Sequence, residues 1–343
     1  METKLCDIQN LNSEEALRGL EQAGEILRSG GLVGFPTETV YGLGANAFDA
    51  EAVAAIFAAK GRPGDNPLIV HVASLQQARE LVEFTPLAEK LAECYWPGPL
   101  TMVLDSRGLV PASVSAGLST LAVRFPSHPG ALAMLRAAER PIAAPSANLS
   151  GRPSPTLAGH VLEDLQGRIP LILDGGPVEI GLESTVVDAR GEYPILLRPG
   201  KVTQDALKLL CGDCPAAGQA DCARPASPGM KYRHYAPQGQ LFLVKNWREA
   251  EALRHSLLQE EAPQPLLLLS EESSRELQRR GVPETQIISL GSEEEPADFA
   301  HNLFAALREA DHRGAGYIIG QSIPAIGLGA AVMNRYTKAA SKK

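Results

Sequence analysis

In KGRPGDNPLIVHVA, residues 60–73, a predicted helix is followed by an apolar strand after a short Pro-Gly turn. The preceding run, DAEAVAAIFAAK, predicts a helix over 49–60 that ends at Lys60-Gly61. The following run, PLIVHVA, predicts a strand over 67–73. A helix followed so closely by a strand is typical of an α/β protein.

The first 210 residues continue this mixture of helices and short strands. Asn12 or Ser13 is placed to cap a first helix that Gly30-Gly31 ends, and Leu32–Phe35 predicts the next strand. Further helices are expected near 86–94, 129–139 and 156–166, and further strands at LTMVLD, LAVRFP, PIAAPS, PLILDGG, STVVDA and PILLRPG. Strands outnumber helices and do not alternate strictly with them. We therefore expect a twisted, mixed α/β sheet over 1–210, with connecting loops that form a cleft.

From Gln240 the pattern changes to a regular alternation. The runs QLFLV, PLLLLS, QIISLG and GYIIGQ predict four strands, each followed by a helix. This order predicts a smaller, Rossmann-like parallel α/β domain over 240–343. The dinucleotide fingerprint G-x-G-x-x-G is missing after its first strand, so GLGAAV at Gly327 is interpreted as a glycine-assisted helix start without a cofactor.

Residues 211–239 form a linker between these two predicted domains. The part over Cys211–Ala226 has no apolar periodicity. The part SPGMKYRHYAPQ is chemically richer, because it places Lys231, Arg233 and His234 beside two tyrosines. These groups bind anions and stack on bases, whereas ordinary tethers are rich in Gly, Ser or Pro.

Composition and charge exclude several classes of protein. The chain has 343 residues, is 44% hydrophobic and carries a net charge of −8, which argues against a strong, sequence-blind nucleic-acid binder. No apolar run approaches the roughly 18 residues of a membrane helix. METKLCDIQN lacks the apolar core of a signal peptide, and five cysteines form no paired framework, so we expect a cytoplasmic protein.

Familiar catalytic signatures are missing from the sequence. There is no G-x-x-x-x-G-K-[ST] loop, no G-x-S-x-G elbow and no H-E-x-x-H zinc site. Cys211, Cys214 and Cys222 suggest zinc only weakly, because a second C-x-x-C is absent.

Two polar segments near the first helix-strand pair have the position of substrate contacts. FPTETVYGLG, residues 35–44, is predicted as a loop directly after a strand; the alternative is a simple turn with Glu38 in solvent. Lys60 and Arg62 lie two residues apart at a helix end. They either complement the helix dipole or form a clamp for phosphate or carboxylate.

Polar residues also occur inside or directly after apolar strands. Arg124, in STLAVRFP, needs an anionic partner from the protein or from a ligand, because a buried unpaired charge is costly. His71, in LIVHV, taken alone favours a structural histidine over a catalyst. Ser146 and Asn148, in APSANLSG, suit a phosphate or a ribose, with a capped turn as the alternative.

Taken together, these segments resemble the YrdC-like family in its long, two-domain form. The paired family signature, K-x-R and S-x-N, stands here as Lys60-Gly61-Arg62 and Ser146-Ala147-Asn148. PTETVYGLG, NPLIVH, WPGPLT, AVRFP, APSAN, ESTVVD and LLRPG match the family pattern in the same order, SPGMKYRHYAP resembles its linker, and AIGLGAAVMNR resembles the end of its second domain. The resemblance covers nearly the whole chain.

The resemblance implies an enzyme of the nucleotidyltransferase kind. It would make L-threonylcarbamoyl-AMP from L-threonine, bicarbonate or CO2 and ATP, with release of pyrophosphate. The product would supply the threonylcarbamoyl group for adenosine 37 of tRNAs that read codons beginning with A, through a downstream tRNA threonylcarbamoyl-transferase machinery. Mg2+ is expected to enter with ATP, held largely by phosphate and water.

The resemblance also implies the site residues. Lys60 and Arg62 are the expected catalytic residues, facing the phosphates or the carbamate. L-threonine is expected at Thr39, His71, Arg124, Ala144 and Ser184. ATP is expected at Arg62, Asn66, Thr120, Ala144, Ser146, Asn148, Ser154, Arg198 and Tyr232. Tyr232 would lie in a linker that closes over the active site as a lid, and no side chain is expected to bind a metal.

Two other functions stay open at this point. One is a carbamoyl transferase of the hydrogenase-maturation type, although the acylphosphatase and zinc-finger segments of such proteins are missing here. The other is a non-catalytic RNA-binding module, although residues 1–210 hold 17 Lys and Arg against 24 Asp and Glu.

Overall fold

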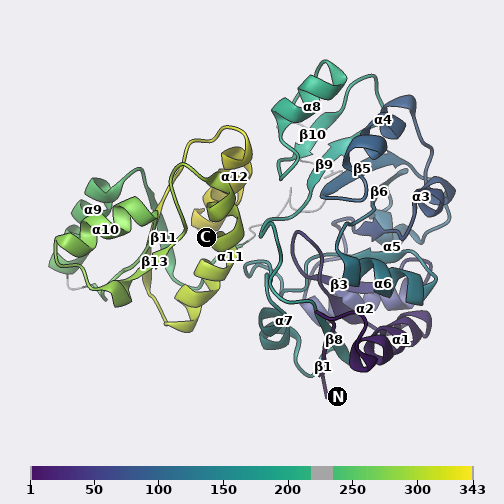
Figure 1. Cartoon of the computed structure of the whole chain (residues 1–343), viewed down its shortest axis with the longest axis horizontal. Helices are drawn as coiled ribbons and strands as arrows, with labels where there is room; N and C mark the ends of the chain where they lie inside the picture. Colours follow the sequence, from purple (N-terminus) through teal and green to yellow (C-terminus); the bar gives the residue numbers. More distant parts are fainter. Residues whose placement is uncertain (1, 218–234, 261, 342–343) are drawn as a thin grey trace. The chain divides into compact units, whose positions relative to one another are not determined.

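The computed structural model describes residues 2–217, 235–260 and 262–341. By its internal packing the chain divides into two compact units (Figure 1). Unit 1 comprises Met1–Ser150 and Ser154–Tyr232, and unit 2 comprises Gly151–Pro153 and Arg233–Lys343.

Unit 1 is a mixed α/β structure, as predicted. Its strands are β1 (Lys4–Asp7), β2 (Val33–Phe35), β3 (Gly42–Asn46), β4 (Ile69–His71), β5 (Leu100–Asp105), β6 (Thr120–Arg124), β7 (Ile142–Ala144), β8 (Leu171–Asp174), β9 (Thr185–Asp188) and β10 (Ile195–Arg198). Its helices are α1 (Glu14–Arg28), α2 (Ala50–Lys60), α3 (Leu75–Leu81), α4 (Pro86–Tyr95), α5 (Ala112–Ser115), α6 (Pro129–Ala138), α7 (Ala158–Leu165) and α8 (Gln204–Cys211).

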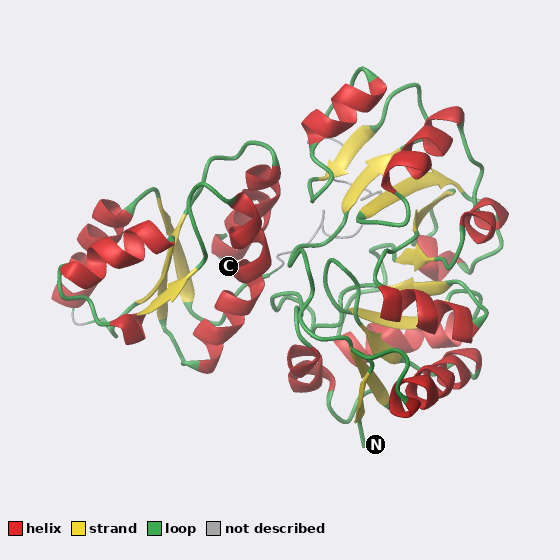
Figure 2. Ribbon diagram, in the orientation of Figure 1, coloured by secondary structure: helices red, strands yellow, loops and turns green. Residues whose placement is uncertain are grey.

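The strands of unit 1 form one sheet in the order β1-β8-β2-β3-β7-β4-β6-β5-β9-β10. The sheet is mixed: it contains parallel pairs, such as β4 with β6 and β5 with β9, and antiparallel pairs, such as β4 with β7 and β5 with β6. Helices flank this sheet (Figure 2). Because the strands do not follow a simple βαβ order, strands that lie far apart in the sequence become neighbours, which brings distant polar residues to the same part of the sheet.

Helix boundaries in unit 1 follow ordinary capping chemistry. Ser13 caps α1 by accepting a hydrogen bond from the amide of Ala16, and Asp49 caps α2 in the same way. Helix α2 ends at Gly61, whose φ of 61° is in the left-handed region that favours glycine. Lys60 is therefore the last residue of a helix, as the sequence predicted.

The segment that contains β3 was predicted wrongly. The segment FPTETVYGLG was expected to be a loop throughout, but Gly42–Asn46 forms β3, antiparallel to β2. A side chain on Gly42 would place its Cβ 2.9 Å from the ring of Phe35, so the glycine is needed for close packing against that ring. Glycine in a strand removes the usual apolar signal, which explains why the sequence indicated a loop.

Unit 2 is a small parallel α/β structure, as predicted. Its elements are β11 (Gln240–Val244), α9 (Trp247–Gln259), β12 (Leu266–Leu269), α10 (Glu271–Arg279), a 3-10 turn (Glu284–Gln286), β13 (Ile287–Ser289), α11 (Pro296–His312), β14 (Tyr317–Gln321) and α12 (Leu328–Ala340). The strand order is β11-β14-β12-β13, and every pair is parallel. Gly327 precedes α12, in agreement with its interpretation as a helix start.

Among the described residues, none of the helices has the length and apolar character needed to cross a membrane.

Residues 211–217, which the sequence analysis placed in the linker, form hydrogen bonds with unit 1. The amide of Leu196 donates to the carbonyl of Pro215, and the amide of Ala217 donates to the carbonyl of Leu196.

Candidate active site

Arg124 ends strand β6 with its guanidinium buried among three partners. Its Nη1 donates to Thr39 Oγ1 at 2.9 Å, and its Nε donates to the carbonyl of Gly98 at 3.4 Å. Its Nη2 lies 2.8 Å from Glu38 Oε1, and both side chains of this ion pair are 4% exposed. The anionic partner that the sequence required is therefore present within the chain.

The alternative placement of Glu38 in solvent is wrong. Burial acts to raise the pKa of this carboxyl, but the charge and hydrogen bond of Arg124 outweigh burial and hold the pKa below its usual value. Glu38 is thus ionised beside Arg124. Sequence reasoning did not include Glu38 among the site residues, because its pairing with Arg124 depends on the tertiary fold.

The loop between β2 and β3 fixes the hydroxyl of Thr39. Thr37 Oγ1 donates to the carbonyl of Val40 at 2.6 Å and lies 2.8 Å from Thr39 Oγ1. Because the single proton of Thr37 is used on Val40, Thr39 is the donor to Thr37 and the acceptor from Arg124. The Thr39 hydroxyl therefore has a defined direction before any substrate binds.

His71 ends β4 directly opposite Arg124 of β6. Its Nδ1 lies 3.2 Å from the carbonyl of Ile69, and its ring is nearly perpendicular to that of Phe35, with the centroids 5.8 Å apart. Burial, and after it the charge of Arg124, lowers the pKa of His71 to about 3. The imidazole is therefore neutral at pH 7. When Nδ1 carries the proton and donates it in a hydrogen bond to the carbonyl of Ile69, Nε2 has a free lone pair and accepts hydrogen bonds.

Ser184 connects the Arg124 region to Arg198. Thr101 lies opposite Arg124 on β5, and its hydroxyl is 2.8 Å from the hydroxyl of Ser184. Arg198 Nη2 donates to Ser184 Oγ and its Nε donates to Ser184 O, both at 3.0 Å. A residue predicted for threonine, Ser184, thus contacts a residue predicted for ATP, Arg198. Thr101 was missed by sequence reasoning, although it lies in the quoted segment WPGPLT.

The K-x-R and S-x-N segments are in direct contact. The Lys60 ammonium, 3% exposed, donates to the carbonyls of Ser146 and Asn148. Ser146 Oγ in turn donates to Asn148 Oδ1, and Asn148 Nδ2 donates to the carbonyl of Leu149 at 2.8 Å. Lys60 therefore fixes the conformation of the S-x-N segment. This role could not be predicted from the location of Lys60 at the end of a helix.

The side-chain amide of Asn66 is buried in unit 1. Its side chain is 1% exposed, and within the described parts of the chain neither amide atom makes a hydrogen bond. Arg62 Nη2 donates to the backbone carbonyl of Asn66 at 3.3 Å. Buried amides are nearly always hydrogen-bonded, so the amide of Asn66 is available to a ligand.

Ser154 lies close to the loop that holds Thr39. Its hydroxyl donates to the buried carboxylate of Glu183 at 2.7 Å. The segment that carries Glu183 runs beside the Thr39 loop, because the amides of Ile180 and Gly181 donate to the carbonyls of Glu38 and Thr39. The Ser154 region and the Thr39 region therefore share one neighbourhood.

The remaining predicted residues have these positions. Thr120 begins β6 and Ala144 ends β7, where it lies opposite Ile69 of β4. Tyr232, Lys231, Arg233 and His234 of the predicted lid, and Cys222 of the weak zinc site, lie outside the described residues. Cys211 and Cys214 carry free thiols, and burial raises the pKa of Cys214 to about 11.

Comparison with known proteins gives consistent matches over both units. The Sua5/YciO/YrdC family model, described as telomere recombination, matches residues 25–200. A second model, described as threonylcarbamoyl-AMP synthase, C-terminal domain, matches residues 202–341.

The chain is 45% identical over 324 residues to threonylcarbamoyl-AMP synthase of Pyrococcus abyssi, covering 92% of each chain. It is 44% identical over 328 residues to threonylcarbamoyl-AMP synthase of Bacillus subtilis, covering 94% of this chain and 92% of the relative. The crystal structure of P. abyssi Sua5 complexed with L-threonine matches the fold with a TM-score of 0.89 at 41% identity, over 99% of this chain and 98% of that chain.

Proposed function

The chain belongs to the threonylcarbamoyl-AMP synthase family, in the form that includes the C-terminal domain, and on that premise we propose that it makes L-threonylcarbamoyl-AMP from L-threonine, bicarbonate or CO2 and ATP. Relatives with this name cover nearly the whole chain, which supports the synthase over carbamoyl transfer of the hydrogenase-maturation type and over a non-catalytic RNA-binding module.

The observation that carries the proposal is the buried pair of Glu38 and Arg124. An amino acid at pH 7 bears one carboxylate and one ammonium. The pair offers a positive group to the first and a negative group to the second, with Arg124 Nη2 and Glu38 Oε1 2.8 Å apart. The carboxylate of L-threonine would bind Arg124, and its ammonium would lie on the side of Glu38. Thr39 Oγ1 and the neutral ring of His71 supply further polar contacts beside the pair.

The reaction then needs two bonds to form. After losing a proton, the threonine amine adds to CO2, and loss of a second proton gives a carbamate. A carbamate oxygen attacks the α-phosphorus of ATP, the bond from that phosphorus to the bridging oxygen breaks, and pyrophosphate leaves. No protein nucleophile is required, so the protein acts by positioning the substrates and by stabilising negative charge.

The ATP side of the site has the groups for that task. The amide of Asn66, which has no hydrogen-bond partner among the described residues, suits a nucleotide atom. Arg198 beside Ser184 suits a phosphate where the two substrates meet. Lys60 donates hydrogen bonds to the backbone carbonyls of Ser146 and Asn148. We therefore assign two roles to Lys60: it fixes the conformation of the S-x-N segment, which binds phosphate, and it supplies a positive charge. Arg62 contributes a second cation near Asn66. The predicted roles of Thr120, Ala144 and Tyr232 stay proposals.

Mg2+ is proposed to arrive as a complex with ATP. In the described parts of the chain, no three His, Cys, Asp or Glu residues are grouped so as to hold a metal ion. Its ligands would be phosphate oxygens and water, as is usual for Mg2+ bound with nucleotides. We also propose that the product passes to a tRNA threonylcarbamoyl-transferase machinery and that the protein acts in the cytoplasm, where that tRNA is available.

One assay tests the function. Pyrophosphate release is measured with ATP and bicarbonate, with and without each of several amino acids. Stimulation by L-threonine but not by L-valine, which has a methyl group in place of the hydroxyl, is the expected result. Release that no amino acid stimulates would reject the proposal.

A further inference from the structure

Thr101 lies in a row of polar side chains that crosses the sheet of unit 1. Thr101 of β5 is directly opposite Arg124 of β6, and Arg124 is directly opposite His71 of β4. Residues that are directly opposite each other on paired strands project to the same face of a sheet. The side chain of Thr101 is therefore on the same face as two side chains that are proposed to bind L-threonine.

The packing of the neighbouring strand residues agrees with this placement. Val70, Met102 and Val123, which alternate with the residues of the row, are buried in the large apolar core of unit 1. The face that carries the row has a separate, small apolar cluster of Ile69, Val103, Ala122 and Val186. Thr101 is 0% exposed beside this cluster, where a residue that only packs would be apolar. A hydroxyl at such a position needs a hydrogen-bond partner.

Ser184 is the partner of the Thr101 hydroxyl. The two hydroxyl oxygens are 2.8 Å apart, and both side chains are buried. Among the described residues, the Thr101 hydroxyl makes no other hydrogen bond. Ser184 Oγ also accepts from Arg198 Nη2 at 3.0 Å. Because a guanidinium can only donate, one lone pair of Ser184 Oγ is used on Arg198.

The direction of the bond between the two hydroxyls decides what Ser184 can offer to a substrate. A hydroxyl has one proton and two lone pairs. If Ser184 donates to Thr101, the buried proton of Thr101 has no acceptor among the described residues, which is costly. If Thr101 donates to Ser184, the Ser184 oxygen accepts from both Arg198 and Thr101, and its proton is left for a substrate oxygen. Only this second arrangement is completed when an anion binds at Ser184.

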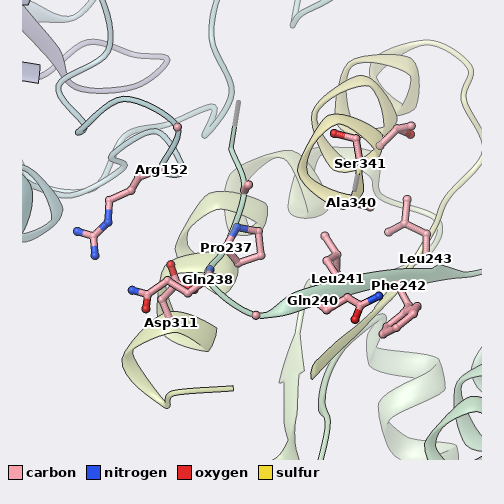
Figure 3. Close-up of a pocket in the computed structure, with 14 residues that line it drawn as sticks. Arg152, Pro237, Gln238, Gln240, Leu241, Phe242, Leu243, Asp311, Ala340 and Ser341 are labelled. Carbon is pink, nitrogen blue, oxygen red and sulfur yellow. The ribbon is translucent and has the colours of Figure 1, made fainter. Parts of the chain in front are cut away.

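The network is contained within unit 1, to which Thr101, Ser184 and Arg198 all belong. Figure 3 shows a different place, a cavity of about 1100 Å³ whose lining residues, among them Gln238 and Asp311, belong to unit 2. The hydrogen bonds of Thr101 and Ser184 therefore depend on the internal packing of unit 1 alone.

We propose that Thr101 is a positioning residue for L-threonine: it donates to Ser184 Oγ and thereby directs the Ser184 proton to an anionic oxygen of the substrate. This inference rests on the proposed function, in which L-threonine brings a carboxylate and, after addition to CO2, a carbamate. With both lone pairs of its oxygen in use, Ser184 contacts the substrate as a donor. Thr101 itself does not touch the substrate and acts through Ser184.

The test uses the full chain and calorimetric titration with L-threonine. Thr101→Val keeps the shape of the side chain but removes the hydroxyl. We expect it to raise the Kd for L-threonine about five-fold, the usual effect of losing one hydrogen bond between neutral groups. Thr101→Ser keeps the hydroxyl and should restore most of the affinity. Thr3→Val is the matched control, since Thr3 Oγ1 donates to the carbonyl of Ile169 and not to a site residue.

A double-mutant cycle with Ser184→Ala measures whether Thr101 acts through Ser184. In the Ser184→Ala background, Thr101→Val should cause no further loss of affinity for L-threonine, because the hydroxyl that Thr101 positions is absent. A loss by the same factor in both backgrounds would show that Thr101 supports only the fold, and it would overturn the proposal. Urea unfolding of each variant is recorded beside the titrations.

The affinity of Thr101→Val can also contradict the proposal directly. Unchanged affinity for L-threonine would show that the site does not need the Thr101 hydroxyl, and higher affinity would show that Ser184 donates to Thr101; either result overturns the proposal. If Thr101→Val does not fold, Thr101→Cys takes its place, because a thiol is a weak donor, and unchanged affinity in that variant counts in the same way. A wild-type protein that binds no L-threonine would instead reject the proposed function.

Discussion

Glu38 and Arg124 form an ion pair in the interior of unit 1, with Glu38 Oε1 2.8 Å from Arg124 Nη2. Each charge lies away from water and depends on the other for its stability. The pair joins the loop after β2 to the end of β6, so the same contact supports the fold and supplies the two charges of the proposed threonine site. Unfolding measurements test the role of the pair in the fold, and binding measurements test its role in the threonine site.

Removing one member of the pair should destabilise the protein more than removing both. Arg124→Gln leaves a buried carboxylate without a counter-charge, and we expect a loss of about 3–5 kcal/mol in the free energy of unfolding. In the double variant, with Glu38→Gln added, most of that loss should be recovered. Urea unfolding of the wild type, both single variants and the double variant measures the coupling. Additive losses would contradict a mutual dependence.

Glu38 should also determine the preference for a substrate that bears an ammonium group. We expect Glu38→Gln to reduce the ratio of affinities for L-threonine over 3-hydroxybutanoate, which lacks the ammonium, by about ten-fold. Competitive titration against L-threonine measures the ratio. The exposed Glu83 provides a control variant, Glu83→Gln. An unchanged ratio would show that the ammonium does not lie near Glu38.

Lys60 should act through the backbone of the S-x-N segment as well as through its charge. Lys60→Met keeps the aliphatic part of the side chain but leaves the carbonyls of Ser146 and Asn148 without this donor. We expect threonine-dependent pyrophosphate release to fall at least ten-fold, with the secondary structure retained by circular dichroism. Lys90→Met, at an exposed position of α4, is the control. Normal turnover in Lys60→Met would show that Lys60 only complements the dipole at the C-terminal end of α2.

His71 should make stability depend on pH below neutrality. Its pKa is lowered from 6.5 to about 3 in the folded protein, first by burial and then by Arg124. The unfolded chain therefore takes up a proton near pH 6.5 that the folded chain does not accept until about pH 3. This group's contribution to stability is constant above pH 6.5 and falls by up to about 1.4 kcal/mol for each pH unit below it.

The pH effect is measured by urea unfolding of the wild type and His71→Gln between pH 4 and 8. The wild type should lose stability relative to the variant as the pH falls below 6.5. His255→Gln, at an exposed position, is the control variant. Parallel curves for the wild type and His71→Gln would show that the folded protein binds the proton as readily as the unfolded chain.

Much of the fold could be predicted from local pattern. The β-α alternation of unit 2 and helices such as α1 and α2 followed from apolar periodicity and capping residues, because these signals arise within a few neighbouring residues. Strand β3 was missed because Gly42 and Gly44 replace the bulky residues that usually indicate a strand. The short helix α3 was not expected either, since seven residues give too little periodicity to recognise.

The contacts of the candidate site were harder to predict than its residues. The motifs indicated Lys60, Ser146 and Asn148, but not that the lysine ammonium bonds to the backbone of the S-x-N segment. In the sequence, Thr101 has the features of an ordinary strand residue. Its position opposite Arg124 follows from the pairing of β5 with β6. Side-chain identity is local information, whereas the hydrogen-bond partner depends on which strands become neighbours.

The class of each unit, the order of the motifs and the need of Arg124 for an anion follow from the amino-acid sequence alone. That need follows from charge and hydrophobicity alone, because a guanidinium in an apolar strand is costly without a partner. The identity of that anion as Glu38, and the packing of Gly151–Pro153 with α11 within unit 2, follow from the three-dimensional fold. Both depend on the mixed strand order and on long-range packing, which bring together residues that no local pattern connects.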